Sequence, residues 1–346
     1  MTTAPLRFGL AGYGAWGKYH AQAIQSTPDC ELTAVCSPSA ASREVAAMET
    51  GAQVFPSIEE MLAAADINVV DIVVPNYLHE ELACAAFGKG KHVLLEKPMA
   101  TSVAACDRII AASKAAGKIL LVGHEMRFSG LHGEVRRILD SGRLGDLRYV
   151  TVDLWGRPYR RGADGWRMDT QRVGNWILEE PVHFFDLAAW YLDRCGAPAT
   201  LFAYGNAMDL GRERDLDADD NFTVIVTYPN GAYAAISHCL GAVEHHLSIK
   251  LFGSKALIRA EWHAELDRSE KPAFELTISE NGAMHLLEVP TTPGETFELR
   301  QEIAAMAAAI RHGAPLPITP EEARRAVMLC VEARRSLELG QAVRLS

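Results

Sequence analysis

The sequence predicts an α/β fold with an N-terminal doubly wound parallel sheet and a C-terminal α+β domain whose large, open sheet is mainly antiparallel. The chain has 346 residues, more than one hydrophobic core usually holds, so we expect two domains. The first ~120 residues alternate short apolar runs with helical patterns, which is typical of a parallel sheet with crossover helices. Longer strand-like runs dominate after Gly123. We therefore expect the domains to cover residues 1–123 and 124–346.

Five strands and four helices are expected in the first domain. The strands are predicted at Leu6–Ala11, Leu32–Cys36, Val69–Val74, His92–Glu96 and Ile119–Gly123, and the helices at Lys18–Gln25, Arg43–Glu49, Glu80–Phe87 and Val103–Ala116. Only one charged residue, Asp71, interrupts the third of these strands. Strands that alternate with helices in this way form a doubly wound nucleotide-binding sheet.

The second domain is expected to hold six strands and four helices. The strands are predicted at Arg148–Trp155, Ala199–Asn206, Phe222–Tyr228, Ala232–His238, His246–Phe252 and Ala256–Trp262, and the helices at Leu131–Ser141, Trp176–Tyr191, Phe297–His312 and Pro320–Leu339. Residues 229–231 read Pro-Asn-Gly, a typical hairpin turn. One face of an open antiparallel sheet needs a covering layer or a second subunit.

Composition and charge exclude several classes of function. The formal net charge of -10 leaves no basic excess to neutralise the phosphates of a nucleic acid. No apolar run reaches the roughly 18 to 20 residues that a bilayer span requires, and the N-terminus lacks a signal-peptide pattern. Seven cysteines show no disulfide spacing, which favours a reducing, cytoplasmic location. His and Cys residues also lack the spacing of a metal site, so we expect no metal.

A glycine-rich motif directly follows the first predicted strand and opens the first helix. It reads Gly12-Tyr13-Gly14-Ala15-Trp16-Gly17. In such a motif the first glycine permits a tight turn, the second lets backbone amides approach a pyrophosphate, and the third allows close helix–strand packing. The helix N-terminus adds partial positive charge beside the phosphates. The sequence thus predicts a Rossmann-type domain that binds NAD(P).

The end of the second strand bears on the choice between NAD and NADP. An acidic residue there would bind the ribose 2′-hydroxyl of NAD and repel a 2′-phosphate. The strand instead continues into Ser37, Pro38 and Ser39, with Arg43 on the following helix. Two hydroxyls and a guanidinium are suited to a phosphate, so the pattern slightly favours NADP, although Arg43 is equally compatible with a surface helix position.

Two further motifs extend the pattern beyond the glycine turn. Asn76 and His79 follow the third strand, and Glu96-Lys97-Pro98 closes the fourth. Together with a later Glu179…His183 pair, these motifs resemble the Gfo/Idh/MocA family over nearly the whole chain. The resemblance implies a nicotinamide-dependent oxidoreductase of sugars or cyclitols, a homodimer or homotetramer formed through the open sheet, and no metal. It also assigns cofactor contacts to Pro75, Asn76, His79, Glu96 and Lys97.

Lys97 and His183 are the expected catalytic pair. Oxidation of a carbinol needs a base for the hydroxyl proton, and an imidazole ordinarily titrates near neutral pH. Lys97 lies at the carboxyl end of a parallel strand, where such sheets bind ligands. The resemblance implies that its ammonium polarises the substrate oxygen. Glu179, four residues before His183, is the expected carboxylate partner if the helix is continuous.

Two residues depart from the family pattern near His183. The family usually has Asp at the position of Glu179 and Gly at the position of Pro181. Proline lacks an N–H group and disfavours helical geometry in the preceding residue, here Glu180. We therefore expect a bent turn before His183, and we count Glu180 among the residues that line the substrate site.

An arginine-rich segment precedes the His183 helix, and two interpretations of it stay open. The segment contains Arg157, Arg160, Arg161, Trp166, Arg167 and Arg172, and Arg127 follows the last strand of the first domain. Its guanidinium groups could bind an anionic substituent of the substrate, with Trp166 stacked on a sugar face. Alternatively they pair with nearby carboxylates in a solvated loop, which we favour slightly, and the tryptophans are buried by default.

Three functions fit the sequence. The first is reversible hydride transfer between NAD(P) and a carbinol carbon of a sugar, sugar derivative or cyclitol. The second is redox-neutral cleavage of a glycoside through transient ring oxidation. The third is a non-catalytic NAD(P) sensor, which the presence of both Lys97 and His183 disfavours.

Overall fold

The computed structural model describes residues 4–157, 162–207, 220–266 and 268–345. The chain divides into two compact units: residues 1–125 with 298–324, and residues 126–297 with 325–346. The segment 298–324 thus returns to the first unit, whereas the sequence pattern placed it in the second domain. The stretch 158–161, which includes Arg160 and Arg161, lies outside the described residues.

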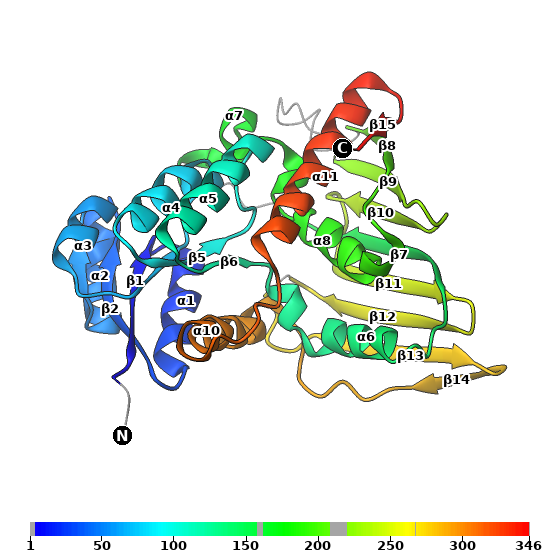
Figure 1. Cartoon of the computed structure of the whole chain (residues 1–346), viewed down its shortest axis with the longest axis horizontal. Helices are drawn as coiled ribbons and strands as arrows, with labels where there is room; N and C mark the ends of the chain where they lie inside the picture. Colours follow the sequence, from blue (N-terminus) through cyan, green and yellow to red (C-terminus); the bar gives the residue numbers. More distant parts are fainter. Residues whose placement is uncertain (1–3, 158–161, 208–219, 267, 346) are drawn as a thin grey trace. The chain divides into compact units, whose positions relative to one another are not determined.

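The first unit contains a six-stranded parallel sheet with the order β3-β2-β1-β4-β5-β6 (Figure 1). Its strands are β1 (Leu6–Ala11), β2 (Cys30–Cys36), β3 (Gln53–Phe55), β4 (Val69–Ile72), β5 (His92–Glu96) and β6 (Leu120–Gly123), and its helices are α1 (Ala15–Ser26), α2 (Ala40–Thr50), α3 (Ile58–Ala64), α4 (His79–Gly88) and α5 (Val103–Ala116), joined by most of α10 (Glu295–His312). The predicted doubly wound sheet is confirmed, and β3 and α3 are additions to it. The order reverses between β1 and β4, and ligands of such sheets bind beyond the strand ends at this point.

Local sequence signals explain where several helices of this unit begin and end. The hydroxyl of Ser102 accepts a hydrogen bond from the Ala105 amide and starts α5, and Gly117 ends that helix in the left-handed region. Ser57 starts α3 in the same way through the Glu60 amide. The strands β1, β4 and β5 bury nearly every side chain, as expected for a sheet covered on both faces.

The second unit contains a nine-stranded sheet with the order β14-β13-β12-β11-β7-β10-β9-β8-β15. Its strands are β7 (Leu147–Trp155), β8 (Thr200–Asn206), β9 (Asn221–Thr227), β10 (Tyr233–Cys239), β11 (His245–Gly253), β12 (Ala256–Ala264), β13 (Ala273–Glu280), β14 (Ala283–Leu286) and β15 (Val343–Arg344). Neighbouring strands run antiparallel except for β10 and β7, which are parallel. The predicted open, mainly antiparallel sheet is confirmed, with three more strands than expected.

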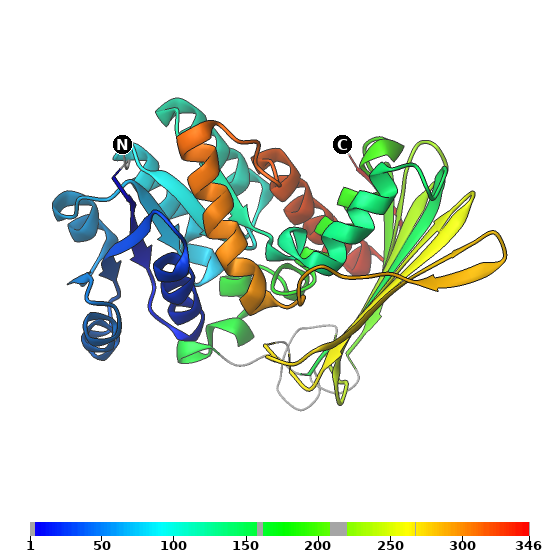
Figure 2. The same ribbon diagram turned by 90° about the horizontal axis from the view of Figure 1, so that it is seen from below.

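Helices cover one face of this sheet. Figure 2 shows α6 (Gly130–Asp140) and α8 (Val182–Tyr191) on the same side, together with α11 (Pro320–Leu339), which belongs to this unit from Arg325 onward. The Ser336 hydroxyl of α11 accepts a hydrogen bond from the Ala203 amide of β8. No described helix lies over the other face, where Tyr149 stacks on Tyr233 and Phe252 at centroid distances of 5.0 and 4.0 Å.

The helix predicted over Trp176–Tyr191 is interrupted. Residues Trp176–Leu178 form a short 3₁₀ turn, and the α-helix starts only at Val182, after Pro181. Proline restricts the residue before it and donates no backbone hydrogen bond, so the bend expected at this point is present. His183 and Asp186 therefore share one turn of α8, whereas Glu179 lies outside the helix.

Candidate functional site

The glycine turn between β1 and α1 has two glycines that the protein's own backbone requires. Gly12 has φ +101°, and a Cβ there would lie 2.1 Å from the carbonyl oxygen of Val73. A Cβ on Gly17 would lie 2.2 Å from the carbonyl oxygen of Gly12. Any side chain at either position would displace backbone, so these two glycines serve the tight turn and the close helix packing.

Gly14 differs from its two neighbours in the motif. It precedes α1 with an extended backbone, φ -84°, which any residue can adopt, and no atom lies within 4 Å of a Cβ built there. The fold itself therefore does not explain a glycine at this position. Open space at the N-terminus of a helix fits the close approach of a pyrophosphate to backbone amides. The turn thus fits the pyrophosphate of NAD(P).

Side chains in and next to the motif form hydrogen bonds and an ion pair with other residues of the first unit. The Tyr13 hydroxyl donates to Glu49 at 2.8 Å, and Lys18 pairs with the other oxygen of the same carboxylate at 2.9 Å. Burial and the neighbouring Glu49 raise the pKa of Tyr13 to about 12. The Trp16 indole donates to Glu96 at 2.8 Å. Trp16 and Tyr13 therefore hold helix α1 in place.

The predicted 2′-phosphate residues lie together after β2. Ser39 starts α2, and its hydroxyl accepts a hydrogen bond from the Ser42 amide. The Arg43 guanidinium donates to the carbonyl oxygens of Ser37 and Pro38 at 2.7 and 2.9 Å. Ser37 and Ser39 thus lie in the loop after β2, and Arg43 of α2 fixes that loop through its carbonyl oxygens.

The segments around Lys97 and His79 are tied to each other. The imidazole of His79 is fully buried, with Nδ1 2.8 Å from the carbonyl oxygen of Pro98 and Nε2 3.0 Å from that of Val74. Burial lowers the pKa of His79. Asn76 is also buried, and the Lys97–Pro98 peptide bond is cis. His79 thus joins the turn after β4 to the turn after β5, so we interpret it as a support of the site.

Glu96 is the centre of a buried polar cluster that the sequence analysis did not recognise. Its Oε1 accepts from Trp16 and lies 3.0 Å from Nε2 of His20, and its Oε2 accepts from the Lys97 amide at 3.1 Å. The other nitrogen of His20 lies 2.9 Å from Asp71. The lone charge of Asp71 in an apolar strand was the available signal, because a buried carboxylate requires a partner.

Burial and the partners of Glu96 act on its pKa in opposite directions. Burial alone would raise the pKa, but the hydrogen bond and charge of His20, with the charge of Lys97 and the Trp16 indole, hold it at about 2. For His20, burial would lower the pKa, yet the carboxylates of Asp71 and Glu96 raise it well above 6.5. Glu96 is therefore ionised and His20 carries a positive charge.

In the second unit His183 lies on the first turn of α8 with only 2% of its surface exposed. Glu179 and Glu180 immediately precede this helix. The Glu179 carboxylate pairs with Arg167 at 2.7 Å, and the Arg167 guanidinium lies 5.4 Å from the ring of Trp166. Glu180 lies 3.6 Å from the imidazole of His245. The structure thus gathers Glu179, Glu180, Arg167 and Trp166 around the bend before α8.

Arg127 has a structural role that the sequence analysis did not anticipate. Its Nε and Nη2 both donate to the Asp186 carboxylate at 2.7 Å, and the two side chains are 1% and 2% exposed. The guanidinium also lies 5.2 Å from the Trp190 ring. Such a buried bidentate pair leaves the charge of Arg127 neutralised inside the unit. Arg127 is therefore assigned to this pair and not to an anionic substrate.

Replacing Asp186 with alanine is expected to lower the free energy of unfolding by about 3–5 kcal/mol, because the buried guanidinium loses its counter-charge. Asp66→Ala serves as a control, since Asp66 is 83% exposed in its pair with Arg7. The control should lose less than about 1 kcal/mol. Urea denaturation of both variants measures the difference, and equal losses would contradict the buried-pair interpretation.

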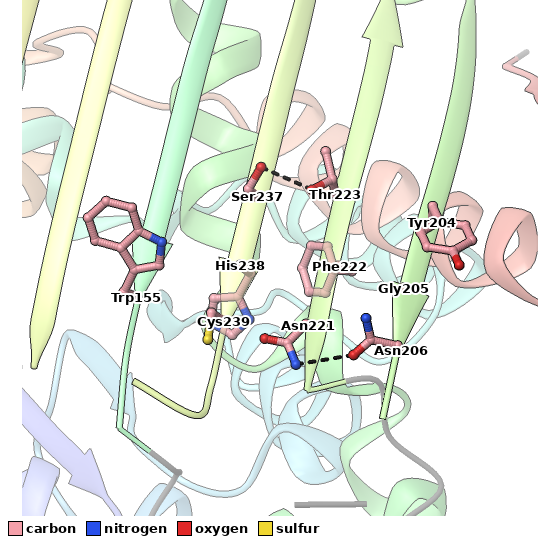
Figure 3. Close-up of a pocket in the computed structure, with 10 residues that line it drawn as sticks. All are labelled: Trp155, Tyr204, Gly205, Asn206, Asn221, Phe222, Thr223, Ser237, His238 and Cys239. Carbon is pink, nitrogen blue, oxygen red and sulfur yellow. Dashed lines mark hydrogen bonds between the residues drawn. The ribbon is translucent and has the colours of Figure 1, made fainter. Parts of the chain in front are cut away.

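A hollow of about 180 Å³ lies on the nine-stranded sheet, and Figure 3 shows the side chains that line it. Its lining comprises Trp155, Tyr204, Gly205, Asn206, Asn221, Phe222, Thr223, Ser237, His238 and Cys239. A hydrogen bond of 3.1 Å joins Thr223 to Ser237, and the Asn221 amide donates to Asn206 at 3.3 Å. None of the predicted site residues lines this hollow.

The described residues contain neither a candidate membrane span nor a candidate metal site. No helix in the ranges 4–157, 162–207, 220–266 and 268–345 is long and apolar enough to cross a membrane. Within the same ranges, no group of three or more His, Cys, Asp or Glu side chains is arranged to hold a metal ion.

The six-stranded sheet, its glycine turn and the open space at Gly14 define a nucleotide-binding protein of the Rossmann class. Comparison with known families makes this more specific. The oxidoreductase family model described as GFO_IDH_MocA, NAD-binding Rossmann fold, matches residues 6–124, and the GFO/IDH/MocA C-terminal domain matches residues 132–259. The chain belongs to the Gfo/Idh/MocA family of oxidoreductases.

Individual relatives extend over most of the chain. Inositol 2-dehydrogenase from Rhizobium meliloti is 29% identical over 96% of this chain and 97% of its own length. The 1,5-anhydro-D-fructose reductase from Ensifer adhaerens is 26% identical over 89% and 90%. The crystal structure of aldose-aldose oxidoreductase from Caulobacter crescentus matches 99% of this chain and 100% of its own with a TM-score of 0.86 and 20% identity, which shows the same fold.

Proposed function

We propose that this protein transfers a hydride between NAD(P) and a carbinol carbon of a sugar, sugar derivative or cyclitol, with Lys97 and His183 as the catalytic pair. The observation that carries the proposal is the glycine turn that leaves open space at Gly14 at the N-terminus of α1. Family membership and relatives named as inositol dehydrogenase and anhydrofructose reductase support the reaction class. Bound nicotinamide supplies or accepts the hydride.

Lys97 is assigned to polarising the substrate oxygen. It directly follows β5, at the carboxyl end of the parallel sheet where ligands of this fold bind. Its own amide donates to the Glu96 carboxylate, so the backbone that carries the ammonium is fixed by a buried hydrogen bond. An ammonium beside the reacting oxygen stabilises the negative charge that develops there.

His183 is assigned to removing the hydroxyl proton in the oxidative direction and returning it in the reductive one. Its position on the first turn of α8 is set by the bend at Pro181, which separates it from Glu179. Glu179 and Glu180 are proposed to bind substrate hydroxyls, with Trp166 beside them. Their pairing with Arg167 and His245 favours hydroxyl recognition over binding of an anionic substituent.

A cofactor-coupled screen tests this function. The protein is incubated with NAD or NADP and with sugars, sugar acids and cyclitols, including myo-inositol, and absorbance of the reduced nicotinamide is followed together with product formation. Net hydride transfer gives product and reduced cofactor in equal amounts. Product without a lasting absorbance change would instead support redox-neutral glycoside cleavage, and cofactor binding without any product would support a sensor.

NADP is proposed as the preferred cofactor because the loop after β2 carries Ser37 and Ser39 and no carboxylate, and Arg43 of α2 contacts this loop. Ser37→Asp is expected to shift the ratio of kcat/KM values from NADP toward NAD by at least about tenfold, since a carboxylate repels a 2′-phosphate. Met48→Asp, at an exposed position near the far end of α2, is the control. An unchanged ratio in Ser37→Asp would remove this loop from cofactor selection.

The bare face of the nine-stranded sheet is proposed as the contact surface of a homodimer or homotetramer. It exposes Trp155, Tyr204, Ile225 and Tyr233, all large side chains with 37% or more of their surface accessible. Apolar surface gathered on one sheet face favours association. Sedimentation velocity of the purified protein measures the oligomeric state, and a monomer at micromolar concentration would contradict this part of the proposal.

A further inference from the structure

Four ionisable side chains from four different elements are buried together in the first unit. They are His20 of α1, Asp71 of β4, Glu96 of β5 and Glu302 of α10, with exposed fractions of 1%, 0%, 7% and 1%. Burying charged groups is costly unless they are paired or lose their charge. Such a cluster directly behind Lys97 therefore calls for a functional explanation.

Three members of the cluster form a hydrogen-bonded chain. The two nitrogens of His20 lie 2.9 Å from Asp71 and 3.0 Å from Glu96. The two carboxylates raise the pKa of His20 well above 6.5 although burial opposes this, so His20 is an imidazolium and both of its nitrogens donate. The imidazolium thus lies between two carboxyl groups, and the Glu96 carboxylate also accepts a hydrogen bond from the Lys97 amide.

Glu302 completes the cluster from a helix that lies far away in sequence. A Cβ built on Gly123 would lie 3.2 Å from Oε1 of Glu302 and 3.4 Å from Oε1 of Glu96, so the two carboxyl groups flank this glycine. Gly123 is also the register partner of Glu96 across β5 and β6. Neither oxygen of Glu302 has a hydrogen-bond partner among the described residues.

The surroundings of Glu302 favour its neutral form. Burial, together with the negative charges of Glu96 and Asp71, raises its pKa from the usual 4.5 to about 8, and the charge of His20 opposes this only in part. Burial also raises the pKa of Asp71, and the charge of His20 opposes this rise. Glu96 is thus the member of the cluster whose pKa is held low, by His20 and by the positive charge of Lys97.

We propose that His20, Asp71 and Glu302 are positioning residues that hold the Glu96 carboxylate as a fixed counter-charge behind Lys97, with Glu302 as a neutral acid. This inference rests on the proposed catalytic role of Lys97. Glu302 acts only through Glu96, because its ionisation would place a second negative charge beside that carboxylate. The network also links Lys97 to α1, whose N-terminus forms the phosphate-binding turn, through His20 and Trp16.

Infrared spectroscopy tests the neutral acid directly. The carbonyl stretch of a protonated carboxyl group should be present in the wild-type protein at pH 7 and absent from Glu302→Gln. Glu81→Gln, which changes an exposed carboxylate of the same unit, should leave that band unchanged. A spectrum in which Glu302→Gln loses no such band would overturn the proposal, and this readout needs neither cofactor nor substrate.

Kinetics test the positioning role. With a substrate found in the screen, wild-type kcat should fall about tenfold from pH 7 to pH 9, as a group with a pKa of about 8 changes from about 90% to about 10% protonated. Glu302→Gln, which keeps the neutral shape, should lack this fall. Asp71→Asn should lower kcat at least tenfold while Kd for NAD and NADP changes less than threefold.

These outcomes separate the positioning role from the proposed function. An identical pH profile in the wild type and Glu302→Gln, or unchanged kcat in a folded Asp71→Asn, would overturn the positioning role. If Asp71→Asn fails to fold, the pH profile of kcat and the infrared spectrum of Glu302→Gln still test the positioning role. Near-normal kcat in Lys97→Ala would instead refute the catalytic role of Lys97 on which this inference rests, whatever the infrared result.

Discussion

Lys97→Ala is expected to lower kcat by about 10²- to 10³-fold, the usual cost of removing one group that stabilises charge at the reacting oxygen. Binding of NAD or NADP alone should change little, since the phosphates are expected at the turn formed by Gly12 and Gly14. Stopped-flow or steady-state assays with the substrate from the screen measure kcat, and fluorescence titration measures the cofactor Kd.

Lys89→Ala is the matched control, because Lys89 is an exposed lysine of the same unit at the end of α4. It should keep the kcat of the unmodified protein. A Lys97→Ala variant with near-normal kcat would remove Lys97 from the catalytic pair. A variant that loses cofactor binding to the same extent as turnover would assign Lys97 to binding alone.

His183→Ala is expected to lower kcat by about 10²- to 10⁴-fold, the range typical of a lost general base. His183→Asn, which keeps a polar group of similar size, should be equally impaired because it cannot accept the proton. The loss should be smaller at high pH, where hydroxide and deprotonated substrate replace the base. Rate profiles from pH 6 to 10 measure this difference.

His285→Ala provides the control for His183, since His285 lies exposed on the edge strand β14. Its pH profile should match that of the unmodified protein. A His183→Ala variant whose kcat falls equally at every pH would indicate a positioning role, and undiminished kcat would exclude His183 from proton transfer.

The sequence predicts the first unit well because its signals are local. The strands β1 and β5 are short apolar runs, one ended by the glycine turn and the other by Glu96-Lys97-Pro98. The bend before His183 was also predictable, since Pro181 restricts its own residue and the one before it. Each of these features depends on residues within a few positions of one another.

Features that depend on contacts between residues far apart in the sequence were harder to predict. The edge strand β14 is exposed along its whole length and lacks the alternation of a half-buried strand. The parallel pairing of β10 with β7 depends on register between segments far apart. Likewise, Arg127 and Asp186 are 59 positions apart, so local patterns do not reveal the carboxylate that pairs with this guanidinium.

The buried cluster illustrates the same limit in the site itself. His20 and its partners Asp71 and Glu96 are 51 and 76 positions apart. Asp71 alone signalled that a polar group lies inside the sheet. The identity of its partners follows only from the three-dimensional arrangement, in which α1, β4 and β5 meet.

Transfer of deuterium tests the central claim most directly. The protein is incubated with oxidised cofactor and with the screened substrate deuterated at the carbinol carbon, and the reduced cofactor is analysed by mass spectrometry. Direct hydride transfer predicts one deuterium in the nicotinamide ring. It also predicts a primary kinetic isotope effect, that is, slower turnover of the deuterated substrate than of the unlabelled one. Oxidised product formed alongside reduced cofactor that carries no deuterium would contradict the account.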